Sequence, residues 1–315
     1  MRRLAAVLIA GLACVCACSR PKPVSSQQEG GPDAGSSAFA PAVGVPGCTL
    51  YGVPRQTGTV PAELGELSGL AAASARHAGI FWAHNDSDNA FRVYALDESG
   101  KIQATLTLTG SKPVDLEDIA VGPCGARAEA PPCLYLADTG DNFQRRPQVR
   151  LFRLPEPEQL SDATLPVETL AFTYPDGPHN AEALVMDVRS GRLAVITKTP
   201  DSLGDVYALE GLSPTATAKA VKLGTLRAPQ DVDRLTTGAD LHPSGERLLL
   251  RTYTRVWEVR RPQAQRLEDL IAGEVAEVPS ASQAQAEAIA LTPGARGYLL
   301  GSEFAGQPLY RTDCR

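Results

Sequence analysis

A weak internal repeat constrains this chain more than any other feature of its sequence. Five segments that pass from polar to apolar residues recur about every 50 residues, and each is followed by a turn and a second apolar stretch. The five openings are 66–70, 115–119, 180–184, 236–240 and 285–289. A repeat of this length is typical of one propeller blade built from four short strands.

The stretches that follow each opening support the same interpretation. Second strands are expected at 80–84, 134–138, 193–197, 248–252 and 298–302, and alternating third strands at 92–96 and 206–209. The chain has 28 Gly and 25 Pro but only 2 Met, which favours short strands joined by tight turns. We therefore predict an all-β fold, a single five-bladed β-propeller over residues 48–315. A six-bladed ring with an extra blade in the long second unit, and a pair of β-sandwiches, are the alternatives.

The two ends of the repeat region indicate how the ring closes. The last unit ends at 309–312, one strand short of a blade, whereas residues 49–53 form an unassigned apolar stretch before the first unit. An N-terminal strand that completes the last blade would remove an exposed sheet edge. It would also bring Cys48 beside Cys314, so we predict a disulfide between them. Cys124 and Cys133 flank a hairpin-like stretch and predict a second, local disulfide, and no Cys-x-x-Cys spacing indicates a metal site.

The N-terminus is typical of an export signal. Two arginines precede an apolar run, 4–15, that is too short to span a bilayer as a helix, and the run leads into Val15-Cys16-Ala17-Cys18. This tetrapeptide resembles the lipobox of bacterial lipoproteins, so residues 1–18 are predicted to be a signal peptide ending at a lipidated, palmitate-carrying Cys18. Cys14 is the next candidate, and an ordinary cleaved signal without lipid is the alternative.

The predicted localisation is the bacterial cell envelope, with the chain held at the outer membrane by its lipid. Residues 19–47 are rich in Ser, Pro, Gly, Ala and Gln and are predicted to be a disordered tether. An oxidising envelope permits the two disulfides. The net charge of -6 and the scattered Lys and Arg residues exclude nucleic acid as a partner, and we expect a monomer.

Polar residues at the blade openings are expected to line the central tunnel. Because residues i and i+2 of a strand share a face, they form two tiers. The first tier is Glu66, Asp115, Asn180, Thr236 and Gln285, and the second is Ser68, Glu117, Glu182, Gly238 and Glu287. Carboxylates gathered in one tunnel repel each other, so they need bound cations, shared protons or basic partners, and a hard cation such as calcium is the simplest of these. The alternative is that they hydrogen-bond to neighbouring backbone amides and fix the blade spacing.

Further candidate ligands and candidate acid–base groups lie near the same end of the blades. Asp86 and Asp138 stand in loops whose Asp and Asn spacing suits calcium, although neither loop matches an EF-hand. Lys198 and Arg251, at the ends of second strands, are candidate salt-bridge partners of the carboxylates. His84 and His179 are the candidate proton-transfer residues or metal ligands. The sequence lacks the Gly-x-Ser-x-Gly, His-Glu-x-x-His and phosphate-loop motifs.

Segments 115–120, 135–142, 174–184 and 251–253 resemble a family of secreted bacterial propellers. More distantly, the Glu-containing blade openings resemble those of phytase-like, SdiA-regulated and SMP-30/paraoxonase-type propellers. The resemblance spans Cys48 to Cys314. It implies a calcium-supported site at one end of the tunnel and, in the enzymatic relatives, hydrolysis of phosphate or carboxylic esters and lactones. Gly238 replaces a carboxylate of the pattern, and the basic cluster that holds polyphosphorylated substrates in phytases is missing.

Two functions fit these observations. In the first, the chain is a non-catalytic envelope module whose ring presents its loops to a glycan, peptide, protein or small ester ligand, and calcium supports the structure. In the second, it is a calcium-dependent hydrolase of phosphate or carboxylic esters, in which Glu117, Glu182 and Glu287 hold the cation and His84 or His179 handles protons. We favour the first, because the sequence carries no catalytic signature and a fold does not fix a function.

Overall fold

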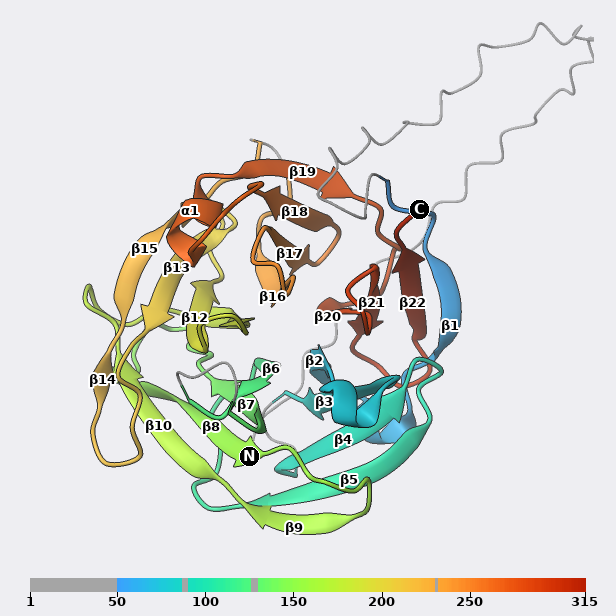
Figure 1. Ribbon diagram of the computed structural model, residues 1–315, viewed down its shortest axis with the longest axis horizontal. Helices are drawn as coiled ribbons and strands as arrows, with labels where there is room; N and C mark the ends of the chain where they lie inside the picture. Colours follow the sequence, from blue (N-terminus) through green and yellow to red (C-terminus); the bar gives the residue numbers. More distant parts are fainter. Residues whose placement is uncertain (1–49, 87–89, 126–129, 230–231) are drawn as a thin grey trace, which may run out of the picture. The chain divides into compact units, whose positions relative to one another are not determined.

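Five β-sheets surround a common axis in the computed structural model, which describes residues 50–86, 90–125, 130–229 and 232–315 (Figure 1). This arrangement confirms the predicted five-bladed β-propeller. Contacts between Cα atoms divide the chain into two units, Met1–Ala38 and Phe39–Arg315, and every described residue belongs to the second. None of the helices in the described part has the length and apolar character needed to cross a membrane.

Each blade begins with an inner strand and proceeds outward. Blade 1 contains β2 (Leu67–Ala72), β3 (Ile80–Asn85), β4 (Arg92–Asp97), β5 (Ile102–Thr109) and β9 (Ala163–Pro166). Blade 2 contains β6 (Asp118–Pro123), β7 (Pro132–Asp138), β8 (Val149–Pro155), β10 (Glu168–Thr173) and β14 (Ala218–Lys219). Blade 3 contains β11 (Ala181–Asp187), β12 (Arg192–Thr197), β13 (Gly204–Leu209) and β15 (Val221–Leu226).

The remaining two blades have four strands each. Blade 4 contains β16 (Thr236–Leu241), β17 (Arg247–Thr252), β18 (Val256–Arg260) and β19 (Glu274–Val278). Blade 5 contains β20 (Ala286–Leu291), β21 (Gly297–Ser302), β22 (Pro308–Asp313) and β1 (Arg55–Thr59). Three short helices, η1 (Ala62–Leu64), η2 (Ala75–His77) and α1 (Leu267–Ile271), join strands. The second strands lie at the predicted positions to within two residues.

Blade 5 confirms that the N-terminal strand closes the ring, although the strand lies later in the chain than predicted. β1 pairs antiparallel with β22, with Arg55 opposite Arg311, whereas the prediction placed the strand at 49–53. Tyr51, in the predicted segment, forms only an isolated bridge with Cys314. The Gly52 amide also donates to the Asp313 carbonyl at 2.8 Å, and the Tyr51 hydroxyl donates a 2.8 Å hydrogen bond to the buried Glu258 of blade 4. The predicted segment therefore supports the closure by both backbone and side-chain bonds.

One of the two predicted disulfides lies within the described residues. Cys124 and Cys133 are bonded, with their Cα atoms 5.0 Å apart, across the hairpin that joins β6 to β7. Cys48 lies outside the described residues, so its pairing with Cys314 stays a prediction. The signal peptide, Cys14, Cys18 and the tether also lie outside them.

The length of the second unit is explained by outer strands and not by a sixth blade. β9 leaves blade 2 and pairs in parallel with β5 on the outer edge of blade 1, and β14 pairs in parallel with β10 in the same way. Each strand covers a sheet edge that would otherwise offer unpaired backbone groups. Each also ties one blade to the next.

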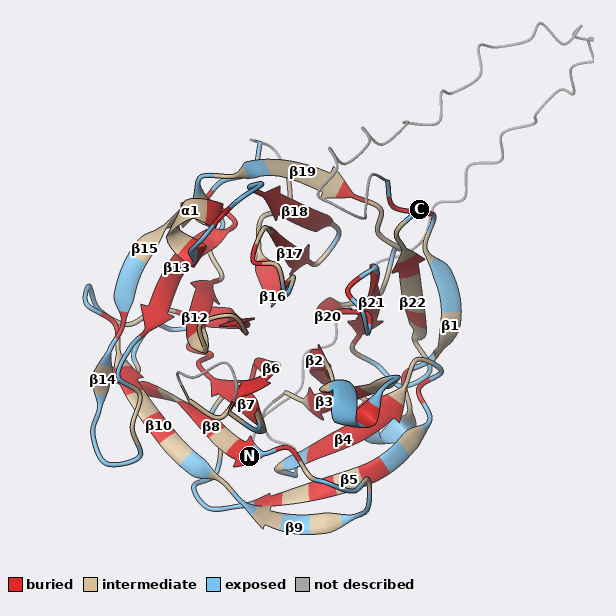
Figure 2. Ribbon diagram, in the orientation of Figure 1, coloured by how far each residue is buried: buried red, intermediate tan, exposed pale blue. Residues whose placement is uncertain are grey.

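The core lies between blades, where apolar faces of neighbouring sheets pack together. Figure 2 shows the inner strands almost wholly buried, whereas exposed residues concentrate on outer strands such as β1, β9 and β15. Trp82, Tyr135, Tyr207 and Tyr298 are the largest aromatic side chains that are fully buried. Burying a large apolar side chain contributes about 1.5–3 kcal/mol, so blade-to-blade packing accounts for much of the ring's stability.

A β-bulge interrupts four inner strands near their first residues. The register between the first two strands of a blade shifts between Leu67 and Gly69, Ala181 and Ala183, Thr236 and Gly238, and Ala286 and Ile289. In blade 2, the amide of Glu117 bonds to the carbonyl of Ala137, which also lies opposite Asp118, so two residues face one there too. A bulge changes the direction in which a side chain points. The residues of the two tiers therefore do not alternate along the strand in the simple way that the sequence predicts.

Candidate metal centre

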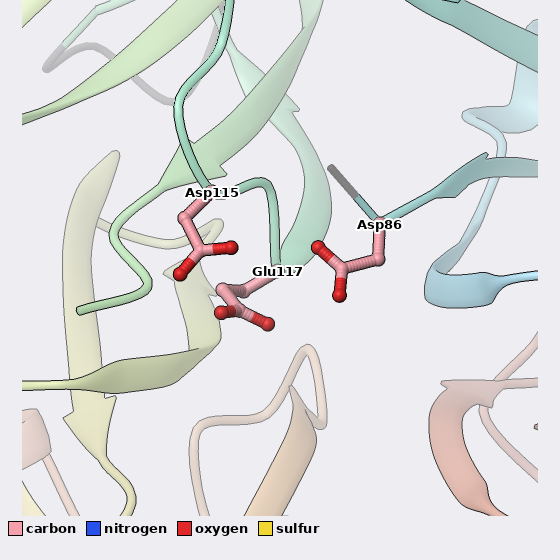
Figure 3. A group of neighbouring side chains, drawn as sticks. All are labelled: Asp86, Asp115 and Glu117. Carbon is pink, nitrogen blue, oxygen red and sulfur yellow. The ribbon is translucent and has the colours of Figure 1, made fainter. Parts of the chain in front are cut away.

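Three carboxylates meet at the acidic end of the propeller, which we define as the end where the inner strands begin. Asp86 follows β3 of blade 1, and Asp115 and Glu117 precede β6 of blade 2. One carboxylate oxygen from each of the three lies within 4.8 Å of the others. Figure 3 shows the side chains of Asp86 and Asp115 on either side of Glu117. A group of hard oxygen donors at this separation is suited to a divalent cation such as calcium.

Gly140 makes room for this group. A Cβ atom at position 140 would lie 2.0 Å from Oε1 of Glu117 and 2.4 Å from Oδ2 of Asp115. The loop after β7 therefore passes directly against the carboxylates, and only glycine fits there. Arg146 holds this loop, because it donates hydrogen bonds of 2.6 Å to the Gly140 carbonyl and 2.9 Å to Asp138 Oδ1. This loop was predicted to supply calcium ligands, but the roles of Gly140 and Arg146 were not predicted.

Burial and like charges act together on Glu117. Burial raises the pKa of its carboxyl well above the usual value, and Glu182, Asp86 and Asp115 raise it further. The Lys198 ammonium lowers the pKa of Glu117, but it only partly offsets the rise. An ionised Glu117 therefore needs additional positive charge nearby, which a bound cation would supply.

Glu182 differs from Glu117 because a lysine already pairs with it. Lys198 Nζ lies 2.6 Å from Glu182 Oε2 and also donates a 2.6 Å hydrogen bond to the Tyr253 hydroxyl. Asn180 Nδ2 donates to the other carboxylate oxygen at 2.9 Å. This is the competing salt bridge that was predicted for Lys198. Arg251 forms no such salt bridge with the described carboxylates: it is fully buried, and its guanidinium donates a 3.1 Å hydrogen bond to Gln283 Oε1.

Glu287 of blade 5 lies close enough to Glu182 for the two carboxyls to interact electrostatically. Burial raises the pKa of its carboxyl to about 8, and the charge of Glu182 contributes to the rise. The Gln285 amide donates to Glu287 Oε1 at 3.4 Å and to Glu303 Oε1 at 2.7 Å. Glu66 is exposed at this end, and the pKa of Glu303 is raised by burial and by the charges of Asp86 and Glu66. The predicted carboxylates therefore gather at one end, and three of them, Asp86, Asp115 and Glu117, lie within reach of one ion.

Asp138 has a different set of partners. Its Oδ1 accepts from the amides of Val114 and Asp115 at 3.1 and 2.9 Å, and Arg150 Nε lies 2.6 Å from Oδ2. With Arg146 also bound, Asp138 positions the segment that carries Asp115. These contacts give Asp138 a positioning role beside the three carboxylates.

The two candidate histidines are held by other groups. His84 is 1% exposed, its Nδ1 faces the Asn85 carbonyl at 2.9 Å, and burial lowers its pKa, so the ring is neutral. A Cβ on Gly69 would lie 2.2 Å from its Nε2, which shows that the ring packs directly against β2. His179 Nε2 lies 2.9 Å from both Asp176 Oδ1 and the Tyr207 hydroxyl. Neither ring is among the groups gathered around Glu117.

Comparison with known proteins identifies neighbours in structure only. No family model matches the chain, and no curated protein matches it. Among solved structures, a gluconolactonase from Xanthomonas campestris is 12% identical, with 90% of this chain and 99% of that chain covered at a TM-score of 0.47. The soluble aldose sugar dehydrogenase from Escherichia coli is also 12% identical, with 83% and 99% covered at a TM-score of 0.47.

Proposed function

We propose that this chain is an exported, lipid-anchored β-propeller that binds one calcium ion at its acidic end and serves as a binding module of the cell envelope. The observation that carries the proposal is the group formed by Asp86, Asp115 and Glu117 around Gly140. Resident calcium would be held by these three carboxylates. Its charge would offset the repulsion that raises the pKa of Glu117.

The chemistry of the donors favours calcium over a transition metal. The group contains only carboxylate oxygens, which hard cations prefer, and it contains neither histidine nor cysteine. Calcium takes six to eight oxygen ligands, more than three carboxylates readily supply. Oxygens from a glycan, a peptide or a small ester would complete such a shell, which is why we propose that this end of the ring receives the ligand.

A binding role is favoured over catalysis by the positions of the histidines. His84 is buried and neutral, and the ring nitrogen Nε2 of His179 is shared between Asp176 and Tyr207. Neither ring belongs to the group formed by Asp86, Asp115 and Glu117. The propeller on this account acts as a monomeric scaffold that displays one cation-supported surface.

The pKa of Glu287 favours hydrolysis as a second candidate function. A carboxyl with a pKa of about 8 carries its proton at neutral pH, and such a group can protonate a leaving alcohol. A bound cation would supply polarisation of an ester or phosphoryl oxygen. The test is turnover of aryl carboxylic and phosphate esters by the full chain, with Glu287→Gln as the variant. Calcium-dependent turnover that this variant loses would establish the hydrolase, and no turnover would leave the binding role.

Melting measurements test the calcium site directly. We expect calcium to raise the melting temperature of the wild-type chain and chelator to reverse the rise, because a ligand that binds only the folded state stabilises it. Glu117→Gln should lose the rise. The matched control is Glu158→Gln, an exposed glutamate in the segment after β8, which should keep it. Equal behaviour of the two variants would refute the site.

Anchoring is tested separately through Cys18. When cells are fed a labelled fatty acid, the wild-type chain should incorporate the label and appear in the membrane fraction. Cys18→Ser should abolish both, whereas Cys14→Ser should leave both unchanged. Label that persists in Cys18→Ser would contradict the assignment.

A further inference from the structure

A pocket of about 810 Å³ lies at the end of the inner strands that is opposite the carboxylates. Every blade contributes an inner-strand residue to its lining: Ala72, Val121, Met186, Leu241 and Leu291. An inner strand of six residues rises roughly 20 Å, and none of Asp86, Asp115 and Glu117 lines the pocket, so it is separate from the proposed calcium site. Its volume lies in the range of about 300–1,000 Å³ that is usual for small-molecule sites.

One positively charged side chain belongs to this mainly apolar lining. Arg76 lies in η2, between β2 and β3, and is exposed. Its Nη1 donates a 2.9 Å hydrogen bond to the Glu156 carbonyl. Its Nε and Nη2 form no hydrogen bond with a described residue, and no described carboxylate forms a salt bridge with it. This edge of the guanidinium is therefore open, and its parallel N–H groups are the donor arrangement that a carboxylate accepts.

The Glu156 carboxylate does not occupy this edge, although its backbone carbonyl binds Arg76. Its Oε1 accepts from the Ser74 amide at 3.0 Å and from the Trp82 indole at 2.8 Å, and its Oε2 accepts from the Ser74 hydroxyl. Both oxygens of this buried carboxylate are thus engaged. The charge of Arg76 is left without an acidic partner in the described part of the chain.

The other two ionisable residues of the described lining carry no charge in mildly acidic solution. Burial lowers the pKa of His242 to about 4, and its Nδ1 lies 2.8 Å from the Ser244 hydroxyl. Burial raises the pKa of Asp240 to about 7, and its Oδ2 accepts from the Leu291 amide at 2.8 Å. At about pH 6, Arg76 therefore supplies the only charge among the lining residues that the structure describes.

We infer that this pocket binds an apolar small molecule that carries one carboxylate group. The apolar body contacts the inner-strand residues, and the carboxylate pairs with the open edge of the Arg76 guanidinium. One guanidinium matches one negative charge, and further charges on the ligand would lie against apolar walls without a partner. The ligand class is therefore an aryl or alkyl monocarboxylate.

Two probes of the same shape test the inference on the full chain. The first, 2-naphthoate, carries the carboxylate, and the second, 2-naphthamide, replaces it with a neutral planar amide. Fluorescence titration at about pH 6, in a chelator that keeps calcium from the acidic end, should show saturable binding of both probes, with 2-naphthoate the tighter. The ratio of the two affinities is compared between variants, because a change in the shape of the pocket affects both probes alike.

Changes of charge at Arg76 should act on this ratio. Arg76→Glu replaces attraction by repulsion and should lower the ratio about tenfold, and Arg76→Gln, which only removes the charge, should lower it about threefold. Arg261→Glu is the matched control and should leave the ratio unchanged. Arg261 is also exposed, its guanidinium also donates to one backbone carbonyl, that of Ala272 at 3.4 Å, and it does not line the pocket. If Arg76→Glu fails to fold, Arg76→Gln carries the comparison.

Filling the pocket provides the second arm of the test. Val121→Trp places a large ring in the lining and should weaken both probes at least about tenfold, because their apolar bodies lose the space they occupy. Val221→Trp is the matched control, because Val221 is an exposed residue of the outer strand β15 and should change neither affinity. If Val121→Trp fails to fold in a melting experiment, Val188→Trp fills the same pocket from blade 3.

Three results would overturn the inference. The first is that 2-naphthoate does not bind the wild-type chain at millimolar concentration. The second is that the change at Arg76 and the control change at Arg261 leave the same ratio of affinities, because the carboxylate would then not pair with Arg76. The third is that a folded variant with the pocket filled binds both probes as the wild type does, because the probes would then bind elsewhere.

Discussion

The two ends of the inner strands have opposite chemical character, although the same five strands form both. At the acidic end, Asp86, Asp115 and Glu117 converge, and Glu182 and Glu287 lie within their electrostatic influence. At the opposite end, a pocket is lined mainly by apolar residues, with the exposed Arg76 also in its lining. The difference arises where the strands begin, because bulges and the loop at Gly140 bring polar groups together at the acidic end.

Two further acids bond to backbone amides of the next blade. The buried Asp118, first residue of β6, accepts from the Leu184 amide, and the half-buried Asp240 of β16 accepts from the Leu291 amide, both at 2.8 Å. These two carboxyls link neighbouring blades. Glu117 and Glu182 rely instead on Lys198 and, in our proposal, on calcium.

The largest expected effect is the contribution of Asp240, which lies outside the cation site, to the pH dependence of the unfolding free energy. Because burial raises the pKa of Asp240 to about 7, the folded chain keeps this proton after the unfolded chain has lost it. Stability from this group is therefore present below pH 4 and is lost as the pH rises through 7, with a cost on the order of 4 kcal/mol. In chelator, Asp240→Asn should flatten the fall of unfolding free energy between pH 4.5 and 7.5.

Chemical unfolding across this pH range is the measurement. Asp201→Asn, at an exposed position, is the control and should keep the wild-type slope. An unchanged slope in Asp240→Asn would show that Asp240 does not keep its proton in the folded chain over this pH range.

The next effect tests the internal cation of the acidic end. Lys198→Met leaves Glu182 buried without its ammonium partner and should cost about 3 kcal/mol of unfolding free energy in chelator. Calcium should restore part of this loss, because Glu182 would gain a second source of positive charge. Lys222→Met, which breaks an exposed pair with Asp205, should cost less than about 1 kcal/mol. Equal costs would mean that Lys198 does not serve the acidic end as proposed.

The smallest expected effect tests whether the calcium ion lies beside Gly140. Gly140→Ala should remove the stabilisation by calcium, about 2.7 kcal/mol at a concentration of 100 times the dissociation constant, because its methyl group would displace the carboxylates. Gly65→Ala is the matched control, since the nearest atom to its added Cβ is 3.8 Å away. Melting with and without calcium compares the two. Retention of the full calcium shift in Gly140→Ala would place the ion elsewhere.

Much of the fold was predictable because the repeat preserves local patterns. Each second strand keeps its apolar alternation, so segments such as Ile80–Asn85 were found almost to the residue. The closing strand was misplaced because Tyr51 is apolar, whereas the true strand, Arg55–Thr59, is largely exposed and carries little periodic signal. The parallel partners β9 and β14 were missed because pairing between blades depends on contacts distant in the chain.

The site was predictable in its residue types but not in its grouping. Spacing placed the carboxylates at one end, yet it did not show that Asp86 reaches Glu117 or that Asp138 is bound by two arginines. His84 looked available in the sequence, but its burial depends on Gly69 from the neighbouring strand. Such distinctions depend on bulges and long-range packing, which leave no local pattern.

Calcium titration of the purified full chain by calorimetry is the direct test of the calcium site. We expect one calcium ion bound per chain, with binding lost in Glu117→Gln and retained in Glu158→Gln. A wild-type chain that bound no calcium at millimolar concentration, or a Glu117→Gln variant that bound calcium as the wild type does, would contradict the site.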